Sequence, residues 1–107
     1  MVMTGIRKVA MPATEIQRVK EYAWRNHLSV SQWTRDILAA YIEEPKAFAD
    51  LPDMEGALSL SLTVYIPDEL WFSARDMAYV HGRKALAPVI RKGFRAALES
   101  EQNPDAA

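Results

Sequence analysis

The sequence predicts a mainly α-helical fold in which four helices pack on one two-stranded antiparallel ribbon. Three observations predict it: an internal repeat, a short alternating strand at the start of each copy, and a proline after each strand. The chain has 107 residues, of which half are apolar, and this length and composition suit one compact domain.

The repeat relates RKVAMPATEIQRVKEYAWRNHLSVSQWTRDILAAYIE to LTVYIPDELWFSARDMAYVHGRKALAPVIRKGFRAALES. At an offset of 55 residues, apolar and proline positions coincide: Val9 with Val64, Met11 with Ile66, and Pro12 with Pro67. One additional residue near Gly82 then aligns Arg35 with Arg91. We therefore predict a first module at 1–44, a linker at 45–58, a second module at 59–100 and a flexible acidic tail at 101–107. The two modules should form one domain.

Each copy opens with a half-buried strand in which apolar and polar side chains alternate. A strand with two short helices has no sheet partner, so we expect residues 6–11 to pair antiparallel with residues 60–66. The inner face of this ribbon would hold Val9, Met11, Leu62, Val64 and Ile66. The outer face would present Thr4, Ile6, Lys8, Ala10, Ser61, Thr63 and Tyr65.

The two prolines end the strands and start the first helix of each copy, at about Ala13 and Asp68. Apolar residues recur at helical spacing in both helices: Ile16, Val19, Tyr22 and Ala23, then Leu70, Ala74, Met77 and Ala78. The helices should end near residues 26–27 and 81–82, where Asn and Gly tolerate the left-handed backbone.

The second helix of the first copy has Ser29 or Ser31 as its cap, and that of the second copy has Pro88 in its first turn. Their apolar stripes are Trp33, Ile37, Leu38, Tyr41 and Ile42, and Val89, Ile90, Phe94, Ala97 and Leu98. Trp24 and Trp71 lie off these stripes and suggest contact with another subunit. The acidic segment 43–58 contains two prolines and a glycine and needs only to carry the chain between the copies.

Composition excludes several classes of function. The chain has no cysteine, and its two histidines are far apart in sequence, so we expect neither a metal site nor another cofactor. No nucleophile lies beside a base, so we expect no catalytic residues and no enzyme activity. We find no signal peptide and no apolar segment of membrane-spanning length, and we predict a cytoplasmic protein without membrane contact.

The formal net charge of −1 conceals an uneven distribution. Residues 1–35 carry six basic and two acidic side chains, and residues 77–98 carry five basic and no acidic ones. These basic blocks occupy equivalent parts of the repeat, so each copy contributes positive charge.

The strand, the proline and the segment SVSQWTRDIL resemble the ribbon-helix-helix DNA-binding family of the Arc and MetJ repressors. The two fused copies are similar to tandem plasmid-transfer proteins such as TraY. The resemblance implies a single-chain pseudo-dimer that inserts the outer face of its ribbon into the major groove. It assigns base contacts to Lys8, Ala10, Ser61, Thr63 and Tyr65. It assigns phosphate contacts to Ser29, Val30 and Ser31, to which the basic side chains add Arg83, Lys84 and Arg91.

Three functions remain open. The first is sequence-specific binding of double-stranded DNA, as a transcriptional repressor or an accessory factor in plasmid conjugation. Its partners would include a second pseudo-dimer on DNA and a relaxase or other protein. The second is a protein-interaction module that kept the fold and lost DNA binding. The third, an antitoxin, is disfavoured because the tail ESEQNPDAA is short and lacks apolar anchors.

Overall fold

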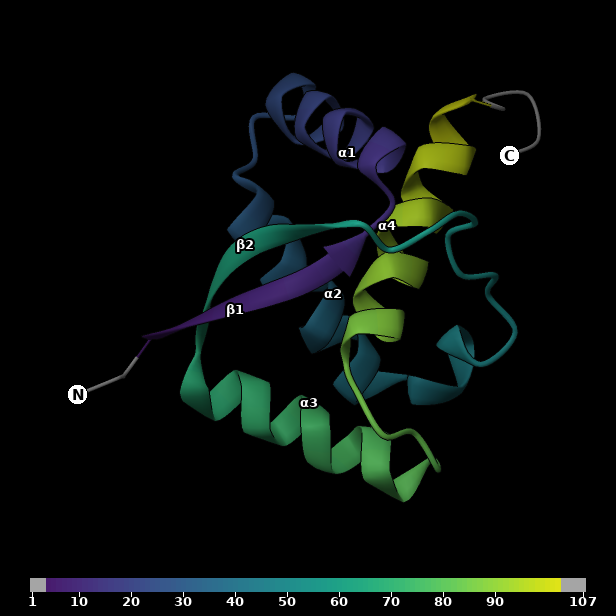
Figure 1. Ribbon diagram of the computed structural model, residues 1–107. Coiled ribbons are helices and arrows are strands. Elements are labelled where there is room, and N and C mark those ends of the chain that lie inside the picture. The colour runs from purple at the N-terminus through teal and green to yellow at the C-terminus, as the bar shows by residue number, and fades with distance from the viewer. Residues whose placement is uncertain (1–3, 103–107) are drawn as a thin grey trace.

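Each half of the chain forms a strand followed by two helices (Figure 1). The computed structural model describes residues 4–102. The first half contains β1 (Thr4–Met11), α1 (Ala13–Arg25) and α2 (Val30–Glu43), and a short 3-10 helix, η1 (Pro45–Phe48), follows it. The second half contains β2 (Leu60–Pro67), α3 (Asp68–Val80) and α4 (Ala87–Gln102).

The two strands pair antiparallel into one two-stranded sheet, here called the ribbon. Lys8 lies opposite Thr63, and these residues are also equivalent at the repeat offset of 55. If a twofold axis relates the two strands, the residues at the axis must be equivalent and must pair with each other, as Lys8 and Thr63 do. The predicted strand pairing is confirmed, with β1 beginning two residues earlier than expected and β2 ending one residue later.

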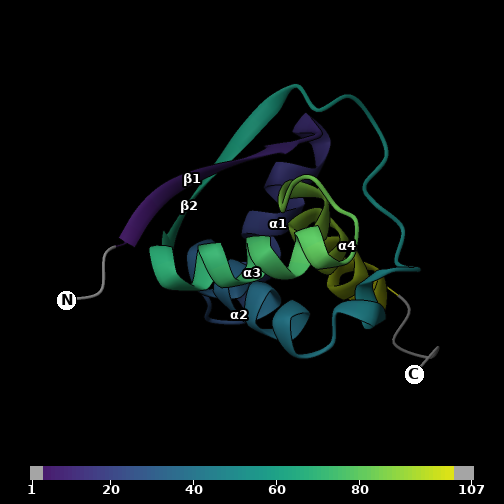
Figure 2. The same ribbon diagram turned by 90° about the horizontal axis from the view of Figure 1, so that it is seen from below.

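The four helices lie on one side of the ribbon, as the view in Figure 2 shows. The inner face of the ribbon is buried against them through the five predicted side chains, Val9, Met11, Leu62, Val64 and Ile66. Helix α1 contacts α4, and α2 contacts both α3 and α4. Both halves therefore contribute to a single core, and neither half buries its strand alone.

The first helix of each half ends in the same way, with a residue in the left-handed conformation. His27 has φ 56° and Gly82 has φ 77°. The next N–H groups bond back into the helix, from Leu28 to the carbonyl of Ala23 at 2.9 Å and from Arg83 to that of Ala78 at 2.8 Å. This is the Schellman arrangement, which satisfies carbonyl groups that the helix end leaves free.

The segment between the halves belongs to the core, so the prediction that it only carries the chain was wrong. Phe48 and Met54 are both 8% exposed and pack in the core. The backbone carbonyl of Phe48 also accepts a hydrogen bond from Lys92 Nζ at 3.3 Å. No local pattern predicts this packing, because the segment has neither helical nor strand periodicity.

Helix α4 continues through Gln102, so residues 101 and 102 of the predicted flexible tail are helical. Glu101 forms an ion pair with Arg25 at the end of α1. The remainder of the predicted tail, residues 103–107, lies outside the described residues.

Candidate nucleic-acid interface

The outer face of the ribbon is an open surface. Figure 2 shows the helices beneath the ribbon, and within residues 4–102 no helix covers the opposite side. The side chains of Ile6 and Tyr65 are 64% and 51% exposed. Lys8, Ser61 and Thr63 are also exposed, and Ala10 is half-buried. The structure thus brings all five residues predicted for base contact onto one face.

The outward side chains stand in close pairs across the ribbon. The backbone N–H of Tyr65 donates to Ser31 Oγ at 2.9 Å, and its carbonyl accepts from Arg35 Nη1 at 2.9 Å. Because both groups point away from β1, Tyr65 and its partner Ile6 form a non-hydrogen-bonded pair. Because the two kinds of pair alternate along the strands, Lys8–Thr63 and Ala10–Ser61 are non-hydrogen-bonded pairs as well. The Cα atoms in such pairs are about 4.5 Å apart, so each pair presents one joined surface.

The N-terminus of α2 lies beside β2. Ser29 is its cap, as predicted, and its Oγ accepts a hydrogen bond from the N–H of Gln32 at 3.0 Å. Ser31 bonds the ribbon edge at Tyr65 rather than capping the helix. Val30, the first residue of α2, is half-buried. The predicted phosphate-binding residues of the first half are therefore together, at one side of the ribbon.

In the second half, basic side chains gather around the turn between α3 and α4. Lys84 is exposed and Arg83 is half-buried. Burial, together with the charge of Arg83, holds the pKa of Lys92 below its usual value. Lys92 was missed by our sequence reasoning, although it belongs to the basic block 77–98.

Arg91 is the exception among the predicted phosphate contacts. It is 5% exposed, and its Nε and Nη2 atoms bond the Asp53 carboxylate at 2.9 and 3.1 Å. Its Nη1 donates to the carbonyl of Ala10 at 2.9 Å. The structure places this guanidinium inside the protein, where it joins the linker, α4 and β1. We therefore correct its assignment to a structural one.

Arg7 lies on the inner side of the ribbon at the start of α3. Its guanidinium is 4.6 Å from the ring centroid of Trp71, and its Nη2 is 3.6 Å from Asp68 Oδ1. Trp71 is half-buried against the core, so the expected contact with another subunit is not needed to explain it. Trp24 is 80% exposed on α1, whereas Trp33 is buried, as predicted.

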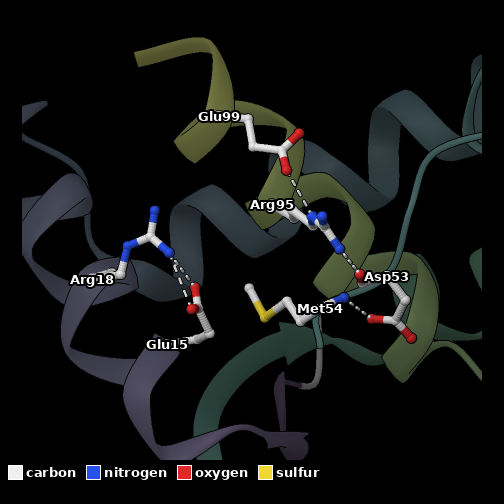
Figure 3. A network of polar contacts seen from close by, with 6 residues as sticks. All are labelled: Glu15, Arg18, Asp53, Met54, Arg95 and Glu99. Carbon is white, nitrogen blue, oxygen red and sulfur yellow. Dashed lines mark hydrogen bonds and ion pairs between the residues drawn. The ribbon is translucent and has the colours of Figure 1, made fainter. Parts of the chain in front are cut away.

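Away from the ribbon, a cluster of polar side chains lies where the linker meets α1 and α4 (Figure 3). Arg95 donates to Glu99 Oε1 at 2.8 Å and to the backbone carbonyl of Asp53, and Arg18 pairs with Glu15 at 2.9 Å. The hydrogen bond to Glu99 raises the pKa of Arg95. The hollow beside these residues has a volume of 210 Å³, below the usual range for a small-molecule site. The hydrogen bond from Arg95 to the carbonyl of Asp53 anchors the linker to α4.

Among the described residues, no three side chains of the types His, Asp and Glu are grouped to hold a metal ion. No helix in this part of the chain combines the length and apolarity needed to cross a membrane.

Comparison with protein-family models, curated proteins and solved structures found no match to this chain.

Proposed function

We propose that this protein is a tandem ribbon-helix-helix protein that binds specific sequences of double-stranded DNA through its ribbon. The observation that carries this proposal is the uncovered outer face of the ribbon, with the Lys8–Thr63 pair at its centre. Its role would be that of a transcriptional repressor or of an accessory factor in plasmid transfer.

The chemistry of the central pair suits base recognition. The major groove is about 12 Å wide and admits a two-stranded ribbon. A lysine at the centre of the ribbon can donate to guanine O6 and N7, and the hydroxyl and methyl groups of Thr63 can contact any base or the methyl of thymine. The inner side of the same ribbon is held by the core, which fixes the direction of these side chains.

The flanking elements suit phosphate binding. The N-terminus of α2 carries a partial positive charge and a serine cap, and both favour an anion. On the other side of the domain, Arg83 and Lys84 supply positive side chains. Contacts of this kind fix the position of a protein on the duplex, while the ribbon reads the bases.

The test is selection from random double-stranded DNA, followed by affinity measurements across a range of salt concentrations. We expect one enriched sequence and binding that weakens steeply with salt, because phosphate contacts release counterions. Lys8→Ala should weaken binding to the selected site by about tenfold, since a specific base contact contributes about 1–3 kcal/mol. Its melting temperature should not change, because Lys8 is exposed.

Lys20→Ala is the matched control, because Lys20 is an exposed lysine on α1 and its loss changes the net charge equally. We expect less than a twofold loss of affinity from it. The absence of any enriched duplex, or equal losses for the two lysine variants, would contradict the proposal.

A second candidate function, protein interaction, is favoured by the exposure of Trp24. An isolated tryptophan that is 80% exposed is uncommon and suits a protein contact. Sedimentation equilibrium without DNA tests this function. If no duplex is selected, a mass that rises with protein concentration, and that no longer does so in Trp24→Ala, would favour it.

A further inference from the structure

We infer that the ribbon has a direction: its Ile6–Tyr65 end reads thymine methyl groups in one half of the DNA site, whereas its Ala10–Ser61 end relies on flanking phosphates. This inference rests on the proposed function and specifies the DNA that the same face binds. The predicted target is a non-palindromic duplex bound in one orientation.

The Ile6–Tyr65 end is apolar and projects from the ribbon. The two side chains face each other across the strands and are 64% and 51% exposed. An exposed isoleucine has no hydrogen-bonding group, so the only feature of a base pair that it recognises in the major groove is the methyl group of thymine. Tyr65 adds a ring and a hydroxyl beside it. This end therefore favours A·T pairs over G·C pairs.

The backbone at this end is held in place from the α2 side. Ser31 accepts from the N–H of Tyr65, and Arg35 donates to its carbonyl, both at 2.9 Å. Arg35 is itself held by Gln32 Oε1 at 2.9 Å. The Tyr65 side chain thus starts from a fixed backbone, and binding orders less of the chain, which favours affinity at this end.

The opposite end carries the small side chains Ala10 and Ser61. The methyl group of Ala10 is half-buried and short, and a serine hydroxyl can donate or accept, so neither side chain excludes a particular base strongly. Base discrimination at this end is consequently weaker than at the other.

The flank of this second end is more basic. Arg91 ties the N-terminal part of α4 to Ala10, and Arg83 and Lys84 lie in the turn before that helix. The residue equivalent to Ser31 is Ala87, and Pro88 has no backbone N–H, so the start of α4 offers fewer hydrogen-bonding groups than the start of α2. Charge replaces hydroxyl and backbone contacts there. The two halves of the DNA site are therefore held by different chemistry.

The experiment uses the selected duplex with thymine replaced by uracil in one half at a time, because uracil lacks only the methyl group. For the unmodified protein we expect about a fourfold loss of affinity per contacted methyl in one half, and no change in the other half. Ile6→Ala should bind more weakly and lose this sensitivity. Ser61→Ala, the matched variant at the opposite end, should keep it.

Orientation is measured independently by cleavage of the DNA from a tethered reagent. The chain has no cysteine, so Ala85→Cys, in the turn before α4, gives a single attachment point. We expect cleavage on one flank only, the flank away from the thymine-sensitive half. Circular dichroism confirms that each variant is folded.

The outcomes separate the two proposals. If no duplex is enriched, the proposed function fails and the direction fails with it. If a duplex is enriched but uracil is neutral in both halves, or equally harmful in both, only the direction is overturned. Equal cleavage on both flanks would also overturn the direction while leaving DNA binding intact.

Discussion

Arg35 and Arg91 make the same hydrogen bond in the two halves of the chain. Arg35 Nη1 donates to the carbonyl of Tyr65, and Arg91 Nη1 donates to the carbonyl of Ala10, each at 2.9 Å. The arginines are equivalent in the repeat, and so are their acceptors. Each half therefore holds the strand of the other. Arg91 differs in being buried and in binding Asp53 as well.

The difference between these arginines predicts unequal effects on stability. Arg91→Ala should lower the free energy of unfolding by about 2 kcal/mol, because it removes a buried guanidinium and leaves the carbonyl of Ala10 and part of the Asp53 carboxylate without their hydrogen-bond donor. Arg35→Ala should lower it by about 1 kcal/mol, because Arg35 is partly exposed and water can replace it. Urea denaturation measures both. Equal losses would show that the Asp53 contact adds nothing.

The contact between α2 and α4 predicts that glycine is required at position 93. A Cβ atom added to Gly93 would lie 2.6 Å from Ile37 Cγ2, which is too close. Gly93→Ala should therefore destabilise the protein by about 1–3 kcal/mol, although alanine alone favours a helix by about 1 kcal/mol. Ile37→Ala combined with Gly93→Ala should recover most of the overpacking cost. Additive effects in this double-mutant cycle would contradict a direct clash.

The left-handed residues that follow α1 and α3 predict effects of opposite sign. His27→Gly should stabilise the protein by about 1 kcal/mol, because a side chain is unfavourable at φ 56°. Gly82→Ala should destabilise it by about 1 kcal/mol at φ 77°, and since no atom lies within 4 Å of the added Cβ, the cost is one of backbone conformation alone. Thermal unfolding of the two variants measures both. A loss of stability in His27→Gly would mean that its side chain makes a contact that outweighs the strain.

Truncation after Glu44 tests whether the halves depend on each other. The fragment keeps β1, α1 and α2 but loses β2 and α4, which pair with β1 and pack on α1. We expect either an unfolded chain or a dimer of two fragments. Such a dimer would bring Ile37 opposite Ile37 instead of Gly93, so it should be weaker than the intact domain. A folded monomer in sedimentation and circular dichroism would refute the dependence.

The ribbon was predictable from the sequence because alternation fixes which side chains face inward. A shift of one residue would have moved Val64 to the outside, so burial of the apolar set specifies the register. The helix starts were also predictable, because proline marks them, and α1 and α3 begin at Ala13 and Asp68 as expected. These are local signals with a single physical interpretation.

The linker and Arg91 were not predictable in the same way. Asp53 lies 38 residues before Arg91, and no local pattern indicates that the two side chains meet. Arg91 also lies in a block of basic residues, and such a block by itself predicts side chains that face solvent. Phe48 and Met54 are single apolar residues in an irregular segment, and only the packed structure shows that they fill the core. Long-range pairing decides these positions.

At the Ile37–Gly93 contact, two equivalent positions of the repeat hold a large side chain and no side chain. In an assembly of two identical subunits, every replacement occurs twice, and a large residue at the meeting point would collide with its own copy. Covalent joining removes that restriction, since a large side chain can sit against none at all. Residues in one half of the chain can therefore be substituted without the same substitution in the other half.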